Sequence, residues 1–248
     1  MTRTLTALVL GLALLATLEA EVTGNSYTTT FPTGESPLSE GGRWINGRTT
    51  GLDWADVHTT PGLAFGTNSI LDNFDDSTAV LSGTWGPDQT VTATVHTVNQ
   101  QSGSVFEEVE LRLRTTIAPH HNSGYEAMFR ATHDGSQYVA VARWNGPLND
   151  FTALGFRQGP GIYDGDVIKA TISGNIITQY INGVVVNTVD ITAVPGPVFT
   201  SGNPGIGFNL QGAPVSANRD FGLRNFTASD QSGAGLPSAP KNLRIVPQ

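Results

Sequence analysis

The sequence predicts an all-β protein whose antiparallel strands form a sandwich or a barrel. Apolar and polar residues alternate with a period of two along most of the chain, as in half-buried strands. Turn residues separate the alternating runs, and the 248 residues include 29 Gly. No long stretch has the period of an amphipathic helix, and many short strands without intervening helices favour an antiparallel all-β architecture.

The N-terminus has the pattern of a secretory signal peptide. Arg3 precedes an apolar run from Leu5 to Leu18, and Ala20 offers a small residue at a cleavage point. The run is short for a bilayer span. We therefore predict that residues 1–20 are removed and that the mature protein is secreted, with no membrane partner. An uncleaved N-terminal anchor is the alternative.

The net charge limits the kinds of partner that the protein can bind, and the cysteine content limits how the fold is stabilised. The chain has 13 Lys and Arg against 21 Asp and Glu, a net charge of -8. Removal of residues 1–20 takes away one Arg and one Glu, so the net charge is unchanged. An acidic protein repels polyphosphate, which argues against nucleic acid as a partner. The chain has no Cys, so its stability depends on its core without disulfides.

The predicted elements follow in chain order. Residues 24–71 are rich in Thr and Gly, and we expect irregular strands and long loops there. Regular strands are predicted at 89–98, 104–117, 124–132, 137–144, 166–173, 175–182, 184–191, 205–210 and 220–228. Asn182-Gly183 lies between two of these strands, and both residue types tolerate the positive φ of a type I′ hairpin turn.

The C-terminal residues 229–248 differ in composition from the rest of the chain. They are rich in Ser, Gly and Pro, which is typical of a linker. Their last part, PSAPKNLRIV, resembles the first strand of a fibronectin type III module. The predicted organisation is therefore a signal peptide at 1–20, one domain at 21–228, and a linker or fibronectin-like tail at 229–248.

Seven segments together carry a family resemblance. They are PLSEGGRW (37–44), GLDWADV (51–57), EVELRLR (108–114), GYEAMFR (124–130), YVAVARWNG (138–146), GDVIKATISGNIITQYINGVVV (165–186) and SGNPGIGF (201–208). In this order they resemble the concanavalin A-like, laminin G-like jelly-roll domains of secreted carbohydrate-active proteins. The resemblance spans residues 27–228 and implies an antiparallel two-sheet jelly-roll sandwich. This fold carries lectins, binding modules, hydrolases and lyases, so it does not define an activity.

The segment EEVELRLR (107–114) is the densest run of charge in the chain. On a strand its Val109, Leu111 and Leu113 face one side, and its Glu108, Glu110 and Arg112 face the other. Glu108 and Glu110 are separated by about 6.5 Å along such a strand, near the carboxyl spacing of a retaining glycosidase. The alternative is a solvated strand face whose charges pair across strands.

Comparison with enzymes of this fold gives two partial matches. Glu108-Val109-Glu110 resembles the start of the Glu-x-Asp-x-x-Glu strand of laminarinase-type hydrolases, but no second catalytic acid follows. Glu110-Leu111-Arg112 resembles the end of the Arg-x-Glu-Leu-Arg strand of jelly-roll alginate lyases, whose first Arg is replaced here by Glu108. For a lyase the base would be Tyr125 or one of His120 and His121. The predicted catalytic residues are thus Glu108, Glu110, Arg112 and Tyr125.

Neighbouring strands extend the predicted site. If they adjoin the first strand, they add Glu126, Arg130 and Arg143 to one polar surface, with Trp144 as an aromatic residue at its rim. Acids alternating with arginines suit hydroxyl-rich or uronate sugars, because Arg binds a carboxylate in a bidentate manner. The alternative is a structural lattice of ion pairs.

No cofactor is required by these interpretations. Jelly rolls of this kind often hold a structural Ca²⁺, and Asp75 and Asp220 are the residues to which we assign one, with turn or capping duty as the alternative. The predicted function is that of a secreted domain that binds a polysaccharide on a charged, concave sheet face. The alternatives are a polysaccharide lyase or glycoside hydrolase that uses the same face, and a non-catalytic surface or virion structural domain. The sequence leaves the oligomeric state and the glycan open.

Overall fold

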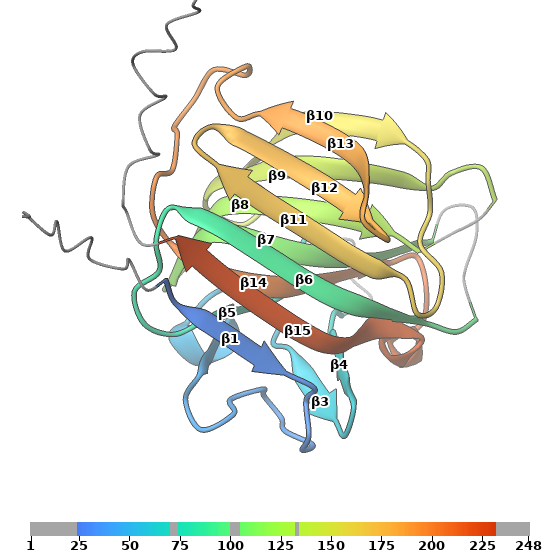
Figure 1. The fold of residues 1–248 in the computed structure, drawn as a ribbon. Helices are drawn as coiled ribbons and strands as arrows, with labels where there is room; N and C mark the ends of the chain where they lie inside the picture. Colours follow the sequence, from blue (N-terminus) through green and yellow to red (C-terminus); the bar gives the residue numbers. More distant parts are fainter. Residues whose placement is uncertain (1–23, 70–73, 100–104, 132–133, 232–248) are drawn as a thin grey trace, which may run out of the picture.

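The computed structural model describes residues 24–69, 74–99, 105–131 and 134–231, which form two antiparallel sheets packed face to face (Figure 1). Within these residues every regular element is a β-strand or a short 3-10 helix. No helix among them has the length and apolar character to cross a membrane. The predicted all-β, two-sheet sandwich is confirmed.

Sheet A, the sheet nearer the viewer in Figure 1, contains eight strands. Their order is β13-β12-β11-β6-β15-β4-β3, and β1 also pairs with β15. The strands are β1 (Ser26–Thr29), β3 (His58–Thr60), β4 (Leu63–Phe65), β6 (Asp88–Thr97), β11 (Val167–Ser173), β12 (Ile176–Ile181), β13 (Val184–Asp190) and β15 (Phe221–Gln231).

Sheet B contains seven strands in the order β10-β9-β8-β7-β14-β5-β2. They are β2 (Trp44–Asn46), β5 (Ser77–Leu81), β7 (Phe106–Ala118), β8 (His121–Arg130), β9 (Tyr138–Gly146), β10 (Phe151–Gln158) and β14 (Asn203–Gln211). Two short 3-10 helices, η1 (Arg48–Thr50) and η2 (Val215–Arg219), complete the regular structure of the described residues.

The nine predicted strands are all present, and the structure adds others. The N-terminal region contains five short strands that complete both sheets. The prediction missed β10, which lies at one edge of sheet B, is largely exposed and has a register shift between Ala153 and Gly155. An irregular, exposed edge strand lacks the clean alternation that predicts a strand.

The domain boundaries differ from the predicted ones at the C-terminal end. β15 continues to Gln231, three residues into the predicted linker, and Ser229 pairs with Ser26 of β1 and Thr90 of β6. The predicted signal peptide and the rest of the predicted tail lie outside the described residues. The predicted hairpin turn is confirmed, because Asn182 and Gly183 have φ values of 50° and 79°.

The hydrophobic core lies between the two sheets. β6 contributes Val91, Ala93 and Val95, and β7 contributes Val109, Leu111 and Leu113, all fully buried. Because side chains alternate along a strand, the residues between the core positions of β7 point to the outer face of sheet B. The fold therefore presents the charged half of EEVELRLR on the side of sheet B that faces away from sheet A.

The charged alternation of β7 ends at a bulge. The register shifts between Leu113 and Thr116, and Arg114 has a φ of 47°. Its guanidinium donates to the carbonyl oxygens of Pro87 at 2.6 Å and of Gly174 at 2.9 Å. A bulge changes the direction of the side chain, so Arg114 joins loops at the end of the sandwich and not the polar face.

Candidate functional site

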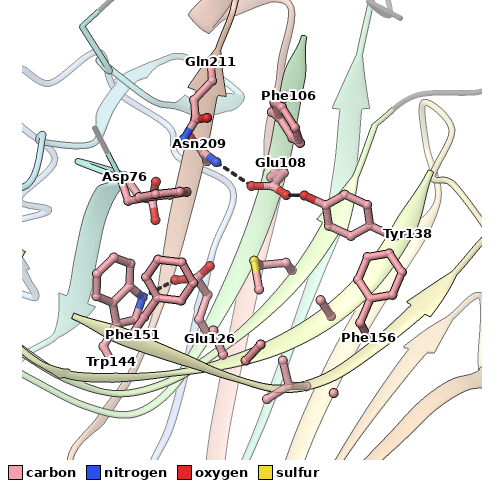
Figure 2. Close-up of a pocket in the computed structure, with 17 residues that line it drawn as sticks. Asp76, Phe106, Glu108, Glu126, Tyr138, Trp144, Phe151, Phe156, Asn209 and Gln211 are labelled. Atoms are coloured by element: carbon pink, nitrogen blue, oxygen red, sulfur yellow. Dashed lines mark hydrogen bonds between the residues drawn. The ribbon is translucent and has the colours of Figure 1, made fainter. Parts of the chain in front are cut away.

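A pocket of about 410 Å³ lies on the outer face of sheet B (Figure 2). Its lining residues come from β7, β8, β9, β10, β14 and the segment before β5. They are Phe74, Asp76, Phe106, Glu108, Glu126, Met128, Tyr138, Ala140, Val141, Ala142, Trp144, Phe151, Ala153, Gly155, Phe156, Asn209 and Gln211. Most of them are aromatic or apolar, and the polar ones are carboxylates and amides.

Aromatic rings form two sides of this pocket. On one side the rings of Trp144 and Phe151 lie 5.4 Å apart, and the ring of Phe74 lies 4.9 Å from that of Phe151. On the other side Tyr138 and Phe156 lie 5.1 Å apart. In Figure 2 Trp144 and Phe151 lie on one side of the view, and Tyr138 and Phe156 lie on the other. They supply apolar surfaces at fixed positions, a feature of small-molecule sites.

Glu108 lies between the two aromatic sides. Its Oε2 accepts a hydrogen bond of 2.6 Å from Nδ2 of Asn209, and its Oε1 accepts one from the hydroxyl of Tyr138 (Figure 2). Burial raises the pKa of Glu108 to about 7, although the Asn209 hydrogen bond opposes this, and the neighbouring Glu126 raises the pKa further. The pKa of Glu108 therefore lies close to neutral pH.

Arg112 forms the centre of a buried ion cluster beneath the pocket. Its Nη2 lies 2.6 Å from Oε2 of Glu110 and 3.8 Å from Oδ2 of Asp76, and its Nη1 lies 2.5 Å from Oε2 of Glu126. One guanidinium thus faces three carboxylates in a region from which solvent is excluded. Burial raises the pKa of Asp76 and of Glu110 well above the usual range, and Glu126 raises both further.

Gly207 explains why the closing PGIGF segment requires glycine. Gly207 of β14 lies opposite Glu110 of β7, and a Cβ built there would lie 2.1 Å from Oε2 of Glu110 and 2.9 Å from Nε of Arg112. A side chain at this position would displace the ion pair. Glycine at this position therefore leaves room for the side chains of Glu110 and Arg112 to pack over β14.

Six of the eight residues predicted from the sequence as catalytic or substrate-binding lie in, under or beside the pocket. Glu108, Glu126 and Trp144 line the pocket. Glu110 and Arg112 lie under it, in the ion cluster. Arg130 lies beside it, where its guanidinium is 4.3 Å from the ring of Phe106 and donates to the carbonyl oxygens of Ser136 and Val105.

Tyr125 and Arg143 require correction, because they lie on the other face of sheet B. Tyr125 is in the core, where its hydroxyl accepts a 2.9 Å hydrogen bond from the amide of Phe199. Arg143 pairs with Tyr125 across the strands, and Ala142 is the residue opposite Glu126. The prediction placed Arg143 with Glu126 without this register, and a shift of one residue exchanges the two faces. Neither side chain lines the pocket.

For two other features the exposure in the structure also differs from the predicted exposure. The charged face of β7 is not a solvated strand face, since Glu108, Glu110 and Arg112 are at most 2% exposed. Trp144 is not a rim residue. It is buried, its ring lies 5.2 Å from that of Trp54, and its Nε1 donates to Oε2 of Glu126 at 2.5 Å. It therefore fixes the carboxylate of Glu126 as well as one side of the pocket.

Among the described residues, only Asp76, Glu110 and Glu126 form a group of three acidic or histidine side chains close enough to share a metal ion, with ligand atoms within 4.8 Å of one another. Arg112 already supplies a positive charge to all three. The residues predicted for calcium are elsewhere. Asp75 lies 3.9 Å from Arg48, and Asp220 follows η2. The calcium site stays a prediction.

Sequence reasoning missed several residues of the pocket. Asp76 was not assigned to this face, and Asn209, Gln211, Phe151 and Phe156 were not assigned a role. The alternation that joins Tyr138, Ala140, Ala142 and Trp144 could have identified the strand that connects the two aromatic sides of the pocket. Asp76 could not be found in this way, because it reaches the site from the other end of sheet B.

Comparison with known proteins identifies the fold. No protein-family model matches the chain, and no curated protein matches it in sequence. The carbohydrate recognition domain of Emp47p is 13% identical and has a TM-score of 0.50, with 86% of this chain and 99% of that domain covered. The metal-free carbohydrate recognition domain of Emp46p is 9% identical with a TM-score of 0.50, covering 84% of this chain and 97% of that domain.

A third solved structure comes from an enzyme. β-Agarase A in complex with oligoagarose is 11% identical, with a TM-score of 0.50, 84% of this chain and 93% of that chain covered. At these identities the likenesses concern the fold alone. The chain is a concanavalin A-like jelly-roll sandwich, as the sequence segments predicted, with an aromatic, acidic pocket on the outer face of sheet B.

Proposed function

We propose that the protein is a secreted carbohydrate-recognition domain that binds a segment of a polysaccharide in the pocket on sheet B. The observation that carries the proposal is the combination of two aromatic sides with a polar floor in one pocket of about 410 Å³. This volume lies within the range of about 300 to 1,000 Å³ that is typical of ligand pockets. The Emp47p and Emp46p domains of the same fold are carbohydrate recognition domains, which supports the proposal.

The polar floor offers hydrogen bonds that the protein itself does not use. Oδ1 of Asp76, Oδ1 of Asn209 and Nε2 of Gln211 are buried and have no hydrogen-bond partner among the described residues. Buried polar atoms are normally paired, and an unpaired one carries a free-energy cost. Sugar hydroxyls both donate and accept hydrogen bonds, so a bound sugar would satisfy both acceptors and the donor while its apolar faces pack on the rings.

A second candidate function is glycoside hydrolysis at the same place. Glu108 is buried, and its pKa of about 7 suits a general acid at neutral pH. Asp76 and Glu126 line the same pocket and supply a second carboxylate. In such a reaction Glu108 would donate its proton to the leaving glycosidic oxygen while one of the other two carboxylates acts as nucleophile or activates water.

The lyase alternative receives less support from the geometry. It needs an arginine that neutralises a uronate carboxylate, yet Arg112 is paired with three acids and Arg143 lies on the other face of sheet B. Arg130 is held by backbone carbonyl oxygens and aromatic rings beside the pocket. Among the described residues that line the pocket, none is basic.

The decisive experiment is a glycan panel with the mature chain. Affinity electrophoresis in gels that contain neutral, amine-bearing, N-acetylated and uronate polysaccharides measures binding, and we expect retardation by at least one of them. Reducing-end release measures hydrolysis, and new absorbance from unsaturated products measures lyase activity. Release that Glu108→Gln abolishes would establish the hydrolase. Absence of both binding and turnover on every glycan would contradict the proposal and favour a structural domain.

A further inference from the structure

Building on this proposed function, we propose that the pocket selects sugar units with a free amino group. The expected ligand is a hexosamine unit of a polysaccharide, whose ammonium group lies between the carboxylates of the floor and the aromatic rings. Three independent features support this class of ligand: the charge of the pocket lining, the incomplete neutralisation of the buried acids, and the position of the rings and unpaired acceptors.

The charge of the lining excludes anionic ligands. Asp76, Glu108 and Glu126 are the ionisable carboxylates of the pocket, and no Lys, Arg or His is found among its described lining residues. The arginines under and beside the pocket have other partners, since Arg112 binds three carboxylates and Arg130 binds carbonyl oxygens and aromatic rings. A uronate or a sulfated sugar would therefore meet negative charge without a compensating cation, which is costly in a buried site.

The buried acids are incompletely neutralised. The guanidinium of Arg112 lies against Asp76, Glu110 and Glu126, and Glu108 is a fourth carboxyl group in the same region, whose raised pKa the charges of Arg130 and Arg112 offset only in part. Burial raises the pKa of Glu108 and of Glu110, so these acids hold protons more readily than they would in water. An ammonium group would supply positive charge in place of these protons and would donate up to three hydrogen bonds. Binding would then release protons from the pocket.

The aromatic rings and the unpaired hydrogen-bond acceptors of the pocket lie where an ammonium group would bind. Oδ1 of Asp76 and Oδ1 of Asn209 have no hydrogen-bond partner, and both side chains are at least nine-tenths buried. In Figure 2 Asn209 lies beside Glu108, whereas Asp76 lies on the side of Trp144 and Phe151, with Tyr138 on the other side. Aromatic faces attract a cation most strongly where it is shielded from water. An uncharged acetamido group would gain neither the attraction between an ammonium charge and the carboxylates nor the third hydrogen bond that an ammonium group can donate.

The test compares tetramers of glucosamine and of N-acetylglucosamine by isothermal titration calorimetry at pH 7. We expect the amine tetramer to bind about tenfold more tightly, which corresponds to about 1.4 kcal/mol and lies within the range of a shielded cation–π contact. We also expect its binding heat to change between buffers of different ionisation enthalpy, which reports the release of protons. A uronate tetramer should show no binding.

Two variants separate the pocket from general attraction between a cationic ligand and an acidic protein. Glu108→Gln and Asp190→Asn each remove one carboxylate, but Asp190 is exposed at the end of β13 in sheet A. Only Glu108→Gln should reduce the preference for the amine and the proton release. If Glu108→Gln does not fold, as judged by its circular dichroism melt, Asp76→Asn takes its place.

The outcomes distinguish this inference from the proposed function. Equal binding of the two tetramers, tighter binding of the N-acetylated one, or an equal effect of both variants would overturn the inference and leave polysaccharide binding standing. Failure of both tetramers, with binding of a neutral glycan from the panel, would do the same. Failure of every glycan would overturn the proposed function itself.

Discussion

The two faces of β7 are equally buried but differ in what they bury. One face places Val109, Leu111 and Leu113 in the core, and the other places Glu108, Glu110 and Arg112 under the pocket. Removal of apolar area from water stabilises the first face without directional requirements. On the second face, desolvation of the charges costs free energy, and only specific ion pairs and hydrogen bonds offset this cost. The comparison separates a surface that stabilises the fold from one that carries the site.

The two faces also differ in their response to pH. Apolar side chains do not titrate, whereas Asp76, Glu108 and Glu110 all have pKa values raised by burial. A folded protein that holds protons more tightly than the unfolded chain loses stability as the pH rises between the two pKa values. Substitutions on the two faces should therefore be distinguishable by unfolding experiments at several pH values.

The largest expected effect comes from Arg112→Met, which removes the cation from three buried acids while it retains much of the side-chain volume. Loss of one partner of a buried ion pair costs about 3 to 5 kcal/mol, because the remaining charges stay buried and uncompensated. We expect this loss in urea unfolding at pH 7, and a smaller loss at pH 5, where the acids are more readily protonated.

Arg224→Met is the matched control for this substitution. Arg224 also binds a carboxylate, with its Nη2 2.6 Å from Oδ1 of Asp164, but it is 45% exposed. An exposed ion pair contributes about 0 to 1 kcal/mol. Equal losses in the two variants would show that the cluster under the pocket behaves as a surface ion pair, and would contradict the contrast between the two faces.

The next effect is expected on the apolar face. Leu111→Ala removes a fully buried side chain of β7 from the core, and such substitutions cost about 2 to 5 kcal/mol. Because no ionisable group is changed, the loss should be the same at pH 5 and pH 8. A loss that depends strongly on pH would mean that the core and the ion cluster are coupled through the strand, and the two faces could not be treated separately.

A smaller effect on the free energy of unfolding is expected from the titration of Glu108. Its pKa is raised from 4.5 to about 7 in the folded protein, so it destabilises the fold as the pH rises through this window. The shift corresponds to a decrease of about 2 to 3 kcal/mol between pH 5 and pH 8. Glu108→Gln cannot titrate, and urea midpoints across this range should fall less steeply than those of the unmodified protein.

Asp190→Asn provides the comparison. The hydrogen bonds from Thr192 lower the pKa of Asp190 below 3.8, so its titration lies outside the range from pH 5 to pH 8. Its pH profile should run parallel to that of the unmodified protein. If the Glu108→Gln profile is parallel as well, the proton on Glu108 does not contribute to the stability of the fold.

The contrast also explains what the sequence could predict. The alternation in EEVELRLR was sufficient to assign the apolar residues of β7 to the core and its charged residues to the other face, because side-chain alternation is a property of a single strand. The same pattern could not show that the charged face is buried. That depends on Asp76, on the glycines of β14 and on the rings of β10, which come from distant parts of the chain.

The misplaced residues have a related cause. Arg143 was assigned to the polar face and Tyr125 was named as a candidate base, yet they pair with each other on the core side of β8 and β9. The period of each strand was predicted correctly, but the register between strands depends on the turns and on the packing of the whole sheet. Local patterns therefore defined the faces of each strand, and tertiary pairing decided which faces form the site.

The smallest effect on stability is expected from an exposed pocket residue, Phe156, whose substitution should clearly weaken binding. Phe156 lines the pocket but is 64% exposed, so Phe156→Ala should change the free energy of unfolding by less than about 1 kcal/mol. It removes one of the two rings on that side of the pocket, and we expect about tenfold weaker binding of the glycan that the panel identifies. Tyr163→Ala is the control, because Tyr163 is 59% exposed and lies outside the pocket lining. Equal affinities of these two variants would contradict the assignment of the pocket, whereas weaker binding of Phe156→Ala alone would show that a side chain with little role in folding carries recognition.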